Sequence, residues 1–181
     1  MEKTVIWRRI HGDGMEYCSH SFGTATRIEG KVICAEPGDR SFVEYTVSCD
    51  PDGCTREVYV RYEEPHQTRT LRLQRDDQNH WTVNGEPRDD LSGLKDIDIG
   101  VTPSTNVLPI RRMKLAAGEA AAVTAVWICF PQLTVQPLKQ SYERLEDNAY
   151  LYRSIASGYT ARLEVDDNGI ALVYEDQWAS L

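Results

Sequence analysis

The side chains best suited to chemistry lie in one segment, residues 96–115, near the middle of the 181-residue chain. Asp96 and Asp98 supply two carboxylates there, while Arg111 and Arg112 supply two adjacent guanidinium groups, and the sequence around them is largely apolar. A short connector of threonine, serine and asparagine with a proline separates the two pairs of charges. Guanidinium forks and carboxylates suit the hydroxyls of a sugar, and arginine also binds phosphate.

Two interpretations of these charges stay open. In the first, the aspartates pair with Arg111 and Arg112 across a hairpin and fix its register, which would be costly to break but would not indicate a function. In the second, the same groups line a cavity and hydrogen-bond a polyhydroxylated head group. The two are compatible, since an ion-paired network can orient a polar cavity wall. We expect Arg111 and the aspartates to hold the fold, and the turn 102–106 with Arg112 to meet a ligand.

Period-two alternation places Asp96 and Asp98 on one face of a strand. The segment 107–115 is also expected to be extended, and Pro109 would make it an edge strand, a bulge or a strand entry because proline lacks an N–H donor. Residues 137–148 are the one segment with helical character, through Leu138, Tyr142 and Leu145. That segment is either a solvated amphipathic helix or a second group of ligand contacts.

Alternation with period two recurs almost everywhere else and predicts a dozen or more short strands. We therefore expect a single mainly all-β domain over residues 1–181, an antiparallel β-barrel or half-open barrel with at most one or two short helices. The apolar run 120–130 is expected to be a strand covered on both sides. Gly30 suggests a bulge or bend, and turns are expected at Pro37-Gly38 and Asn168-Gly169.

The C-terminal part of the chain is rich in aromatic residues. These rings either belong to the core or form a stacking wall for sugars or acyl chains, because their polar tips suit a wet pocket mouth. The residues concerned are Tyr150, Tyr152, Tyr159, Tyr174 and Trp178.

Composition narrows the classes of partner. The net charge of −8 argues against nonspecific binding to nucleic acid or to an anionic bilayer. No apolar run reaches the length of about 20 residues that a membrane span needs, and the opening residues lack the apolar core of a signal peptide. The expected location is the cytoplasm, as a monomer or small homo-oligomer.

The five cysteines form no even framework, and Cys49 and Cys54 are expected to be thiols at strand ends. The four histidines lack metal-ligand spacing, so we expect no metal site and no cofactor. A glycine-rich phosphate loop, a Gly-x-Ser-x-Gly elbow and a His-Glu-x-x-His motif are missing, which favours binding over catalysis. A carboxylate pair, either Asp96 with Asp98 or Glu143 with an aspartate, keeps a hydrolase of sugar or lipid conjugates open.

The chain resembles the Putative glycolipid-binding family, known as a bacterial domain of unknown function. The most specific match is the run Thr102-Pro103-Ser104-Thr105-Asn106-Val107-Leu108-Pro109-Ile110-Arg111-Arg112, supported by Asp96-Ile97-Asp98, by Gln140-x-Tyr142-Glu143-Arg144-Leu145, and by residues near both ends of the chain. One departure is Gly53-Cys54, where a tryptophan is expected before Thr55, and this would alter a cavity mouth nearby.

The resemblance implies a β-rich domain similar to the half-open barrels of bacterial lipoprotein carriers, with an amphiphilic ligand such as a glycolipid. Apolar strands would hold the acyl chains. A protein-interaction module that adds a strand at an open barrel edge is a further alternative. The side chains expected to meet the polar head are Asp98, Thr102, Asn106, Arg111, Arg112, Gln140, Tyr142 and Arg144.

Overall fold

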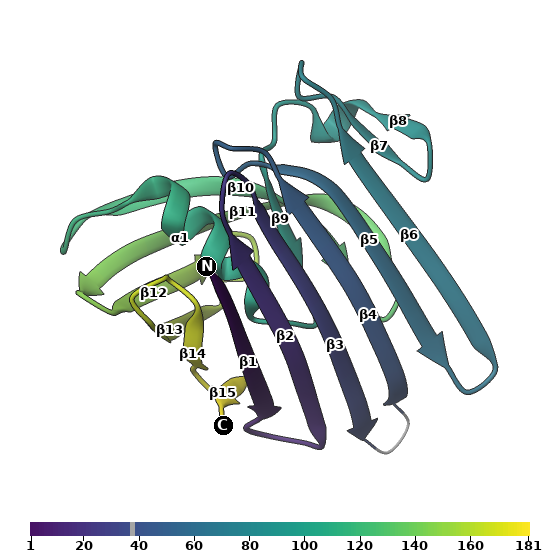
Figure 1. The fold of residues 1–181 in the computed structure, drawn as a ribbon, viewed down its shortest axis with the longest axis horizontal. Coiled ribbons are helices and arrows are strands. Elements are labelled where there is room, and N and C mark those ends of the chain that lie inside the picture. Colours follow the sequence, from purple (N-terminus) through teal and green to yellow (C-terminus); the bar gives the residue numbers. More distant parts are fainter. Residues whose placement is uncertain (37–38) are drawn as a thin grey trace.

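The computed structural model describes residues 1–36 and 39–181, which form a 15-stranded sheet (Figure 1). The sheet order runs from β8 back to β1, continues with β15, and then runs back to β9. β1 and β15 pair in antiparallel fashion, so the first and last strands lie side by side in the middle of the sheet. β9 and β10 pair in parallel, whereas the other neighbouring strands are antiparallel.

One half of the sheet comes from the first part of the chain. Its strands are β1 (Glu2–Arg9), β2 (Gly14–Phe22), β3 (Thr26–Glu36), β4 (Asp39–Cys49), β5 (Thr55–Glu64), β6 (Gln67–Arg75), β7 (Trp81–Val83) and β8 (Glu86–Arg88). The other half contains β9 (Asp96–Ile99), β10 (Ala120–Cys129), β11 (Thr134–Glu146), β12 (Ala149–Ser154), β13 (Thr160–Val165), β14 (Ala171–Tyr174) and β15 (Trp178–Ser180). The described chain also contains two short 3-10 helices, η1 (Asp89–Leu91) and η2 (Ser104–Asn106), and one short α-helix, α1 (Val107–Met113).

Alternating burial explains why the N-terminal strands form a wall with an apolar inner face. In β4, Val43, Tyr45 and Val47 are fully buried, and they stand opposite buried residues of β5, among them Val58 and Val60. β-branched and aromatic side chains pack well on such a pleated surface. The mainly all-β fold predicted from alternation is therefore confirmed, as a rolled sheet in which no described ladder joins β8 to β9.

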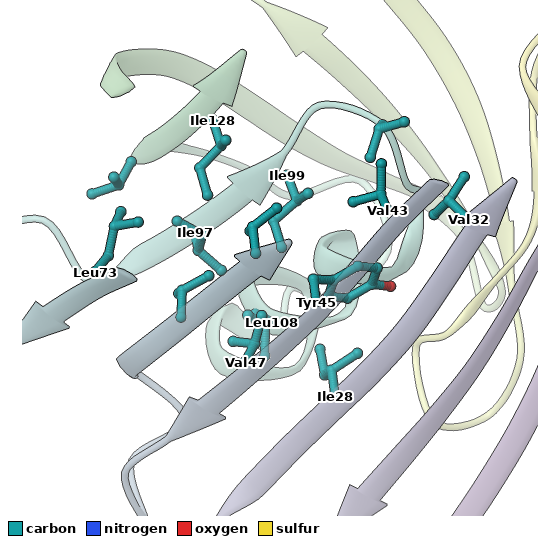
Figure 2. Close-up of a cluster of buried hydrophobic side chains, with 14 of the residues drawn as sticks. Ile28, Val32, Val43, Tyr45, Val47, Leu73, Ile97, Ile99, Leu108 and Ile128 are labelled. Atoms are coloured by element: carbon teal, nitrogen blue, oxygen red, sulfur yellow. The ribbon is translucent and has the colours of Figure 1, made fainter. Parts of the chain in front are cut away.

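The sheet rolls far enough for β9 and β10 to lie against the inner face of the N-terminal wall. Cross-strand partners share a face, so Ile97, Ile99 and Ile128 stand together on the side of the sheet opposite to Asp98. Figure 2 shows these isoleucines in one buried cluster with Leu73 and with side chains of β3 and β4. The second half of β10 is mostly buried on both faces, as expected for the apolar run 120–130.

Of the bulge or bend expected at Gly30, the structure excludes the bulge. β3 pairs with β2 and with β4 through Gly30 without a register shift. Gly30 lies opposite Tyr45, and a Cβ atom at residue 30 would be 2.1 Å from Cζ of the Tyr45 ring. The glycine is needed because the phenol ring lies across the strand at this position.

The expectation of an extended segment after residue 106 was wrong, because Val107–Met113 forms the short helix α1. Pro109 occupies the first turn, where its missing N–H removes no helical hydrogen bond. Lys114 ends the helix in the left-handed conformation, with φ of 49°. The helix lies between the two walls of the rolled sheet (Figure 1), and Val107, Leu108 and Ile110 are buried.

Residues 137–148, expected to be helical, lie mainly in the long strand β11. Leu138, Gln140 and Tyr142 face the same side, because their partners on β10 are Ala125, Val123 and Ala121. The polar Gln140 on this buried face concealed the period-two pattern. The strands β12, β13 and β14 form an antiparallel three-strand meander.

Two further expectations concern turns and thiols. The predicted turn at Pro37-Gly38 lies outside the described residues, whereas the turn before Ile170 closes with a hydrogen bond from Gly169 N to Asp166 O. Cys49 and Cys54 flank the β4–β5 hairpin as free thiols. Among the described residues, no helix is long and apolar enough to cross a membrane.

Candidate ligand-binding site

A pocket of about 490 Å³ opens among β9–β12, β14 and the loops beside them. This volume lies within the range of about 300–1,000 Å³ that is typical of small-molecule sites. The pocket combines aromatic rings with a few polar groups. Its lining residues are Asp98, Gly100, Thr102, Asn106, Trp127, Gln136, Pro137, Leu138, Tyr152, Ser154, Ala156, Ser157, Tyr159 and Tyr174.

Strand register places one row of this lining. Asp98 on β9 stands beside Trp127 on β10, and Trp127 stands opposite Gln136 on β11. The three side chains therefore project from the same face of the sheet. Gly100 leaves room for the indole, since a Cβ there would be 2.8 Å from Nε1 of Trp127.

Three tyrosines form a second wall. The ring centroids of Tyr152 lie 6.3 Å from Tyr159 and 6.1 Å from Tyr174, and those of Tyr159 and Tyr174 are 6.5 Å apart. Such tilted contacts are favourable for aromatic pairs. Tyr159 is 38% exposed and forms the rim. These rings therefore pack against each other and also line the pocket.

Asp98 provides the pocket's carboxylate, and burial raises its pKa to about 6. Nε2 of Gln140 donates a hydrogen bond to Oδ2 of Asp98, which opposes this rise. Within the described chain, Gln140 is the one hydrogen-bond partner of the Asp98 side chain. Asp98 as a whole is half-buried and lines the pocket.

Gln140 and Tyr142 lie directly behind the lining. The Tyr142 hydroxyl donates to Oδ1 of Asn106 over 2.8 Å, and Nδ2 of Asn106 donates to the Pro103 carbonyl over 3.0 Å. Both Gln140 and Tyr142 are buried. They therefore orient Asp98 and Asn106, while Asp98, Thr102 and Asn106 themselves reach the pocket.

Glu16, which lies on β2 behind Thr102, was not among the site residues predicted from the sequence. Oγ1 of Thr102 is 2.8 Å from Oε1 and 2.7 Å from Oε2 of Glu16, and the Tyr45 hydroxyl also donates to this carboxyl group. Burial raises the pKa of Glu16 to about 7. The available signal was alternation, because Glu16 shares a face of β2 with the buried residues Cys18 and His20.

The three arginines expected at the ligand lie outside this pocket. Arg112 pairs with the buried Asp96, with Nε 3.3 Å from Oδ1 and a second contact from Nη2. Arg111 instead stacks 4.1 Å from the Phe22 ring centroid and donates to the Asn168 carbonyl over 3.0 Å. Both arginines thus bond to other parts of the fold, as expected for Arg111, and Arg112 is the one that pairs with an aspartate.

Arg144 donates to the Leu115 carbonyl over 2.8 Å and to the Asp147 carbonyl over 2.7 Å. It holds the end of the β11–β12 hairpin. Two smaller hollows beside α1, lined in part by Arg111 with Arg112 and by Arg111 with Arg144, are separate from the pocket. Gly53, at the position where a tryptophan was expected, lines the first of these hollows and not the main pocket.

The sequence suggested two catalytic carboxylate pairs, Asp96 with Asp98 or Glu143 with an aspartate, and in neither case do both members line the pocket. Asp96 is engaged by Arg112, and burial raises its pKa against the opposing effect of that arginine. Glu143 forms an ion pair with Arg153 over 2.9 Å. It follows the inward-facing Tyr142 on β11, so its side chain lies on the opposite face of the sheet. Asp98 is thus left as the carboxylate that lines the pocket.

Comparison with known proteins gives one sequence family and two solved structures. The family model described as "Putative glycolipid-binding" matches residues 4–180. A crystal structure of a DUF1089 family protein from Pseudomonas aeruginosa matches with a TM-score of 0.82 at 29% identity, covering 97% of this chain and 95% of that chain. A beta-barrel-like protein of DUF1849 from Brucella abortus gives a TM-score of 0.49 at 11% identity, covering 99% and 94%. No curated protein matches the sequence.

Proposed function

Because the chain belongs to the Putative glycolipid-binding family, we propose that its pocket binds the polar head of an amphiphile, a glycolipid or related lipid. One observation carries this proposal: the same pocket is lined by the aromatic rings of Trp127 and Tyr152 and by the polar side chains of Asp98 and Asn106. Aromatic faces stack on the apolar face of a sugar ring, while carboxylate and amide groups bind its hydroxyls. Ligand sites commonly combine such an apolar wall with a few fixed polar groups.

The lipid tail needs a different place from the one expected from sequence. The inward apolar side chains of the strands already pack against each other in two buried clusters. The tail therefore leaves through the pocket mouth, past Tyr159, toward Ile155, which is 55% exposed and adjoins two lining residues in the chain. An exposed apolar residue at this rim supports such a path.

Lipid extraction and mass spectrometry of the purified protein test the proposal. A bound or exchangeable amphiphile is expected in the wild type, and Tyr159→Ala should lower its occupancy severalfold by removing part of the rim. Tyr17→Ala is the matched control, because Tyr17 is 53% exposed on β2 and does not line the pocket. An empty wild-type protein that also takes up no added glycolipid would contradict the proposal.

Asp98 supports a second candidate, a hydrolase that acts on a sugar or lipid conjugate. A carboxyl group with pKa of about 6 can donate a proton near neutral pH, as a general acid does. Asp98→Asn should then abolish turnover while the ligand still binds. Failure of the wild type to hydrolyse any member of a panel of glycosides and esters would remove this candidate and leave the binding proposal intact.

A further inference from the structure

The charge of the pocket comes from an acidic side chain. Asp98 is the one charged residue among the described residues that line it. Burial raises the pKa of Tyr159 at the rim, and the neighbouring carboxylates of Asp176 and Glu175 raise it further. The Tyr159 hydroxyl therefore stays neutral, and Asp98 supplies the negative charge that the described lining places near a bound head group.

The three arginines expected at the ligand, Arg111, Arg112 and Arg144, do not compensate this charge. Arg112 is engaged by Asp96, Arg111 by Phe22 and Asn168, and none of the three arginines lines the pocket. Asp98 receives one neutral hydrogen bond, from Gln140. A partly desolvated carboxylate without a counter-ion is unfavourable, and a cation that arrives beside it relieves that cost.

The aromatic lining favours the same kind of ligand. Trp127, Tyr152, Tyr159 and Tyr174 all border the pocket. The faces of such rings carry negative electrostatic potential and attract ammonium groups, with Trp and Tyr the strongest. An anionic head group would meet both this potential and the Asp98 carboxylate, and the described lining offers it no cation.

We propose that the pocket selects head groups that carry a protonated amine, such as an amino sugar, over neutral and anionic head groups. The amine forms an ion pair with Asp98 and lies against the ring of Trp127 or of a neighbouring tyrosine. This inference rests on the proposed function, since it specifies the chemistry of the head group in the same pocket.

Calorimetric titration at pH 7 with three octyl glycosides tests the inference. The probes are octyl glucoside, which is neutral, octyl 2-amino-2-deoxyglucoside, which carries an amine, and octyl glucuronide, which is anionic. All are used below their micellar concentrations. We expect the amino glycoside to bind at least tenfold more tightly than the glucoside, about 1.4 kcal/mol, and the glucuronide to bind most weakly.

Variants separate the pocket charge from the charge of the whole protein. Asp98→Asn keeps an acceptor for Gln140 and should reduce the preference for the amine to less than threefold. Asp147→Asn is the matched control, because it removes one negative charge from a 99% exposed side chain outside the pocket and should keep the tenfold preference.

The outcomes distinguish the two proposals. Equal binding of glucoside and amino glycoside, or an amine preference that survives Asp98→Asn, overturns the inference but leaves binding of a glycolipid head in place. Tighter binding of the glucuronide overturns it as well. If natively folded protein binds none of the three glycosides, both the inference and the proposed function are contradicted.

Discussion

Oγ1 of Thr102 lies 2.7 Å from Oε2 of Glu16, so the turn after β9 is bonded to a strand of the opposite wall. The hydroxyl also accepts a hydrogen bond from the Ser104 amide over 3.0 Å, and Tyr45 contacts Ser104 at 2.5 Å. Glu16 is 1% exposed, whereas Thr102 lines the pocket. The buried carboxyl group thus positions one edge of the pocket from behind.

The titration of Glu16 should make stability depend on pH. Folding raises its pKa from 4.5 to about 7, so its stabilising contribution is complete below pH 4.5 and is lost as the pH rises through 7. Glu16→Gln removes this titration. Relative to the variant, the wild type should lose on the order of 3 kcal/mol between pH 4.5 and pH 8.

Urea unfolding of both proteins at pH 5, 6, 7 and 8 measures this difference. Other groups titrate in the same range: burial lowers the pKa of His20 to about 4, for example, which acts in the opposite direction. Their contribution cancels when the variant is subtracted from the wild type. Parallel stability curves for the two proteins would show that Glu16 has an ordinary pKa.

Gly30→Ala should destabilise the fold because its methyl group would overlap the Tyr45 ring, which also carries the hydroxyl that bonds Glu16. We expect a loss of about 1–3 kcal/mol in the free energy of unfolding, the usual range for overpacking. Gly23→Ala is the control, since apart from its chain neighbours no atom of the described residues lies within 4 Å of its added Cβ. Equal effects of the two substitutions in thermal or urea unfolding would argue against the close contact.

The adjacent arginines should differ sharply in their effects on stability. Arg112→Ala leaves the Asp96 carboxylate, 2% exposed, without its counter-ion and should cost about 3 kcal/mol. Arg111→Ala removes a contact over Phe22 and an exposed hydrogen bond, for an expected loss of about 1 kcal/mol. Chemical denaturation of both variants is the measurement, and a larger loss for Arg111→Ala would reverse the assignment.

The strands were largely predictable because inward and outward residues alternate along them, as in β4 and in the meander β12–β14. The failures occurred where other interactions override that pattern. The helix α1 has only seven residues, too few to display a helical period, and Pro109 near its start resembles a strand breaker. Gln140 is a polar residue on the inward face of β11, where it hydrogen-bonds Asp98. The alternation of apolar and polar residues that marks a strand is therefore interrupted there.

The candidate site was predictable only in part. The turn residues Thr102 and Asn106, together with Asp98, stand out as polar groups in apolar sequence, and the structure brings all three to one pocket. Their partners come from distant strands: Trp127 from β10 and Glu16 from β2, positions that only the register of the rolled sheet brings near. The local sequence does not show whether an arginine lines a pocket or forms an ion pair within the fold. Arg112 pairs with Asp96, which lies 16 residues earlier in the chain.

The most direct test of ligand binding in this pocket is a proton–nitrogen NMR titration that follows the tryptophan indole signals while octyl glucoside is added. Single tryptophan-to-phenylalanine variants assign the signals. Trp127 lines the pocket, whereas the indoles of Trp7 and Trp81 donate to the Ala171 carbonyl over 2.7 Å and the Leu94 carbonyl over 2.9 Å, and neither lines it. We predict a saturable shift of the Trp127 signal with those of Trp7 and Trp81 unchanged. An unchanged Trp127 signal at saturating glycoside would contradict the proposal.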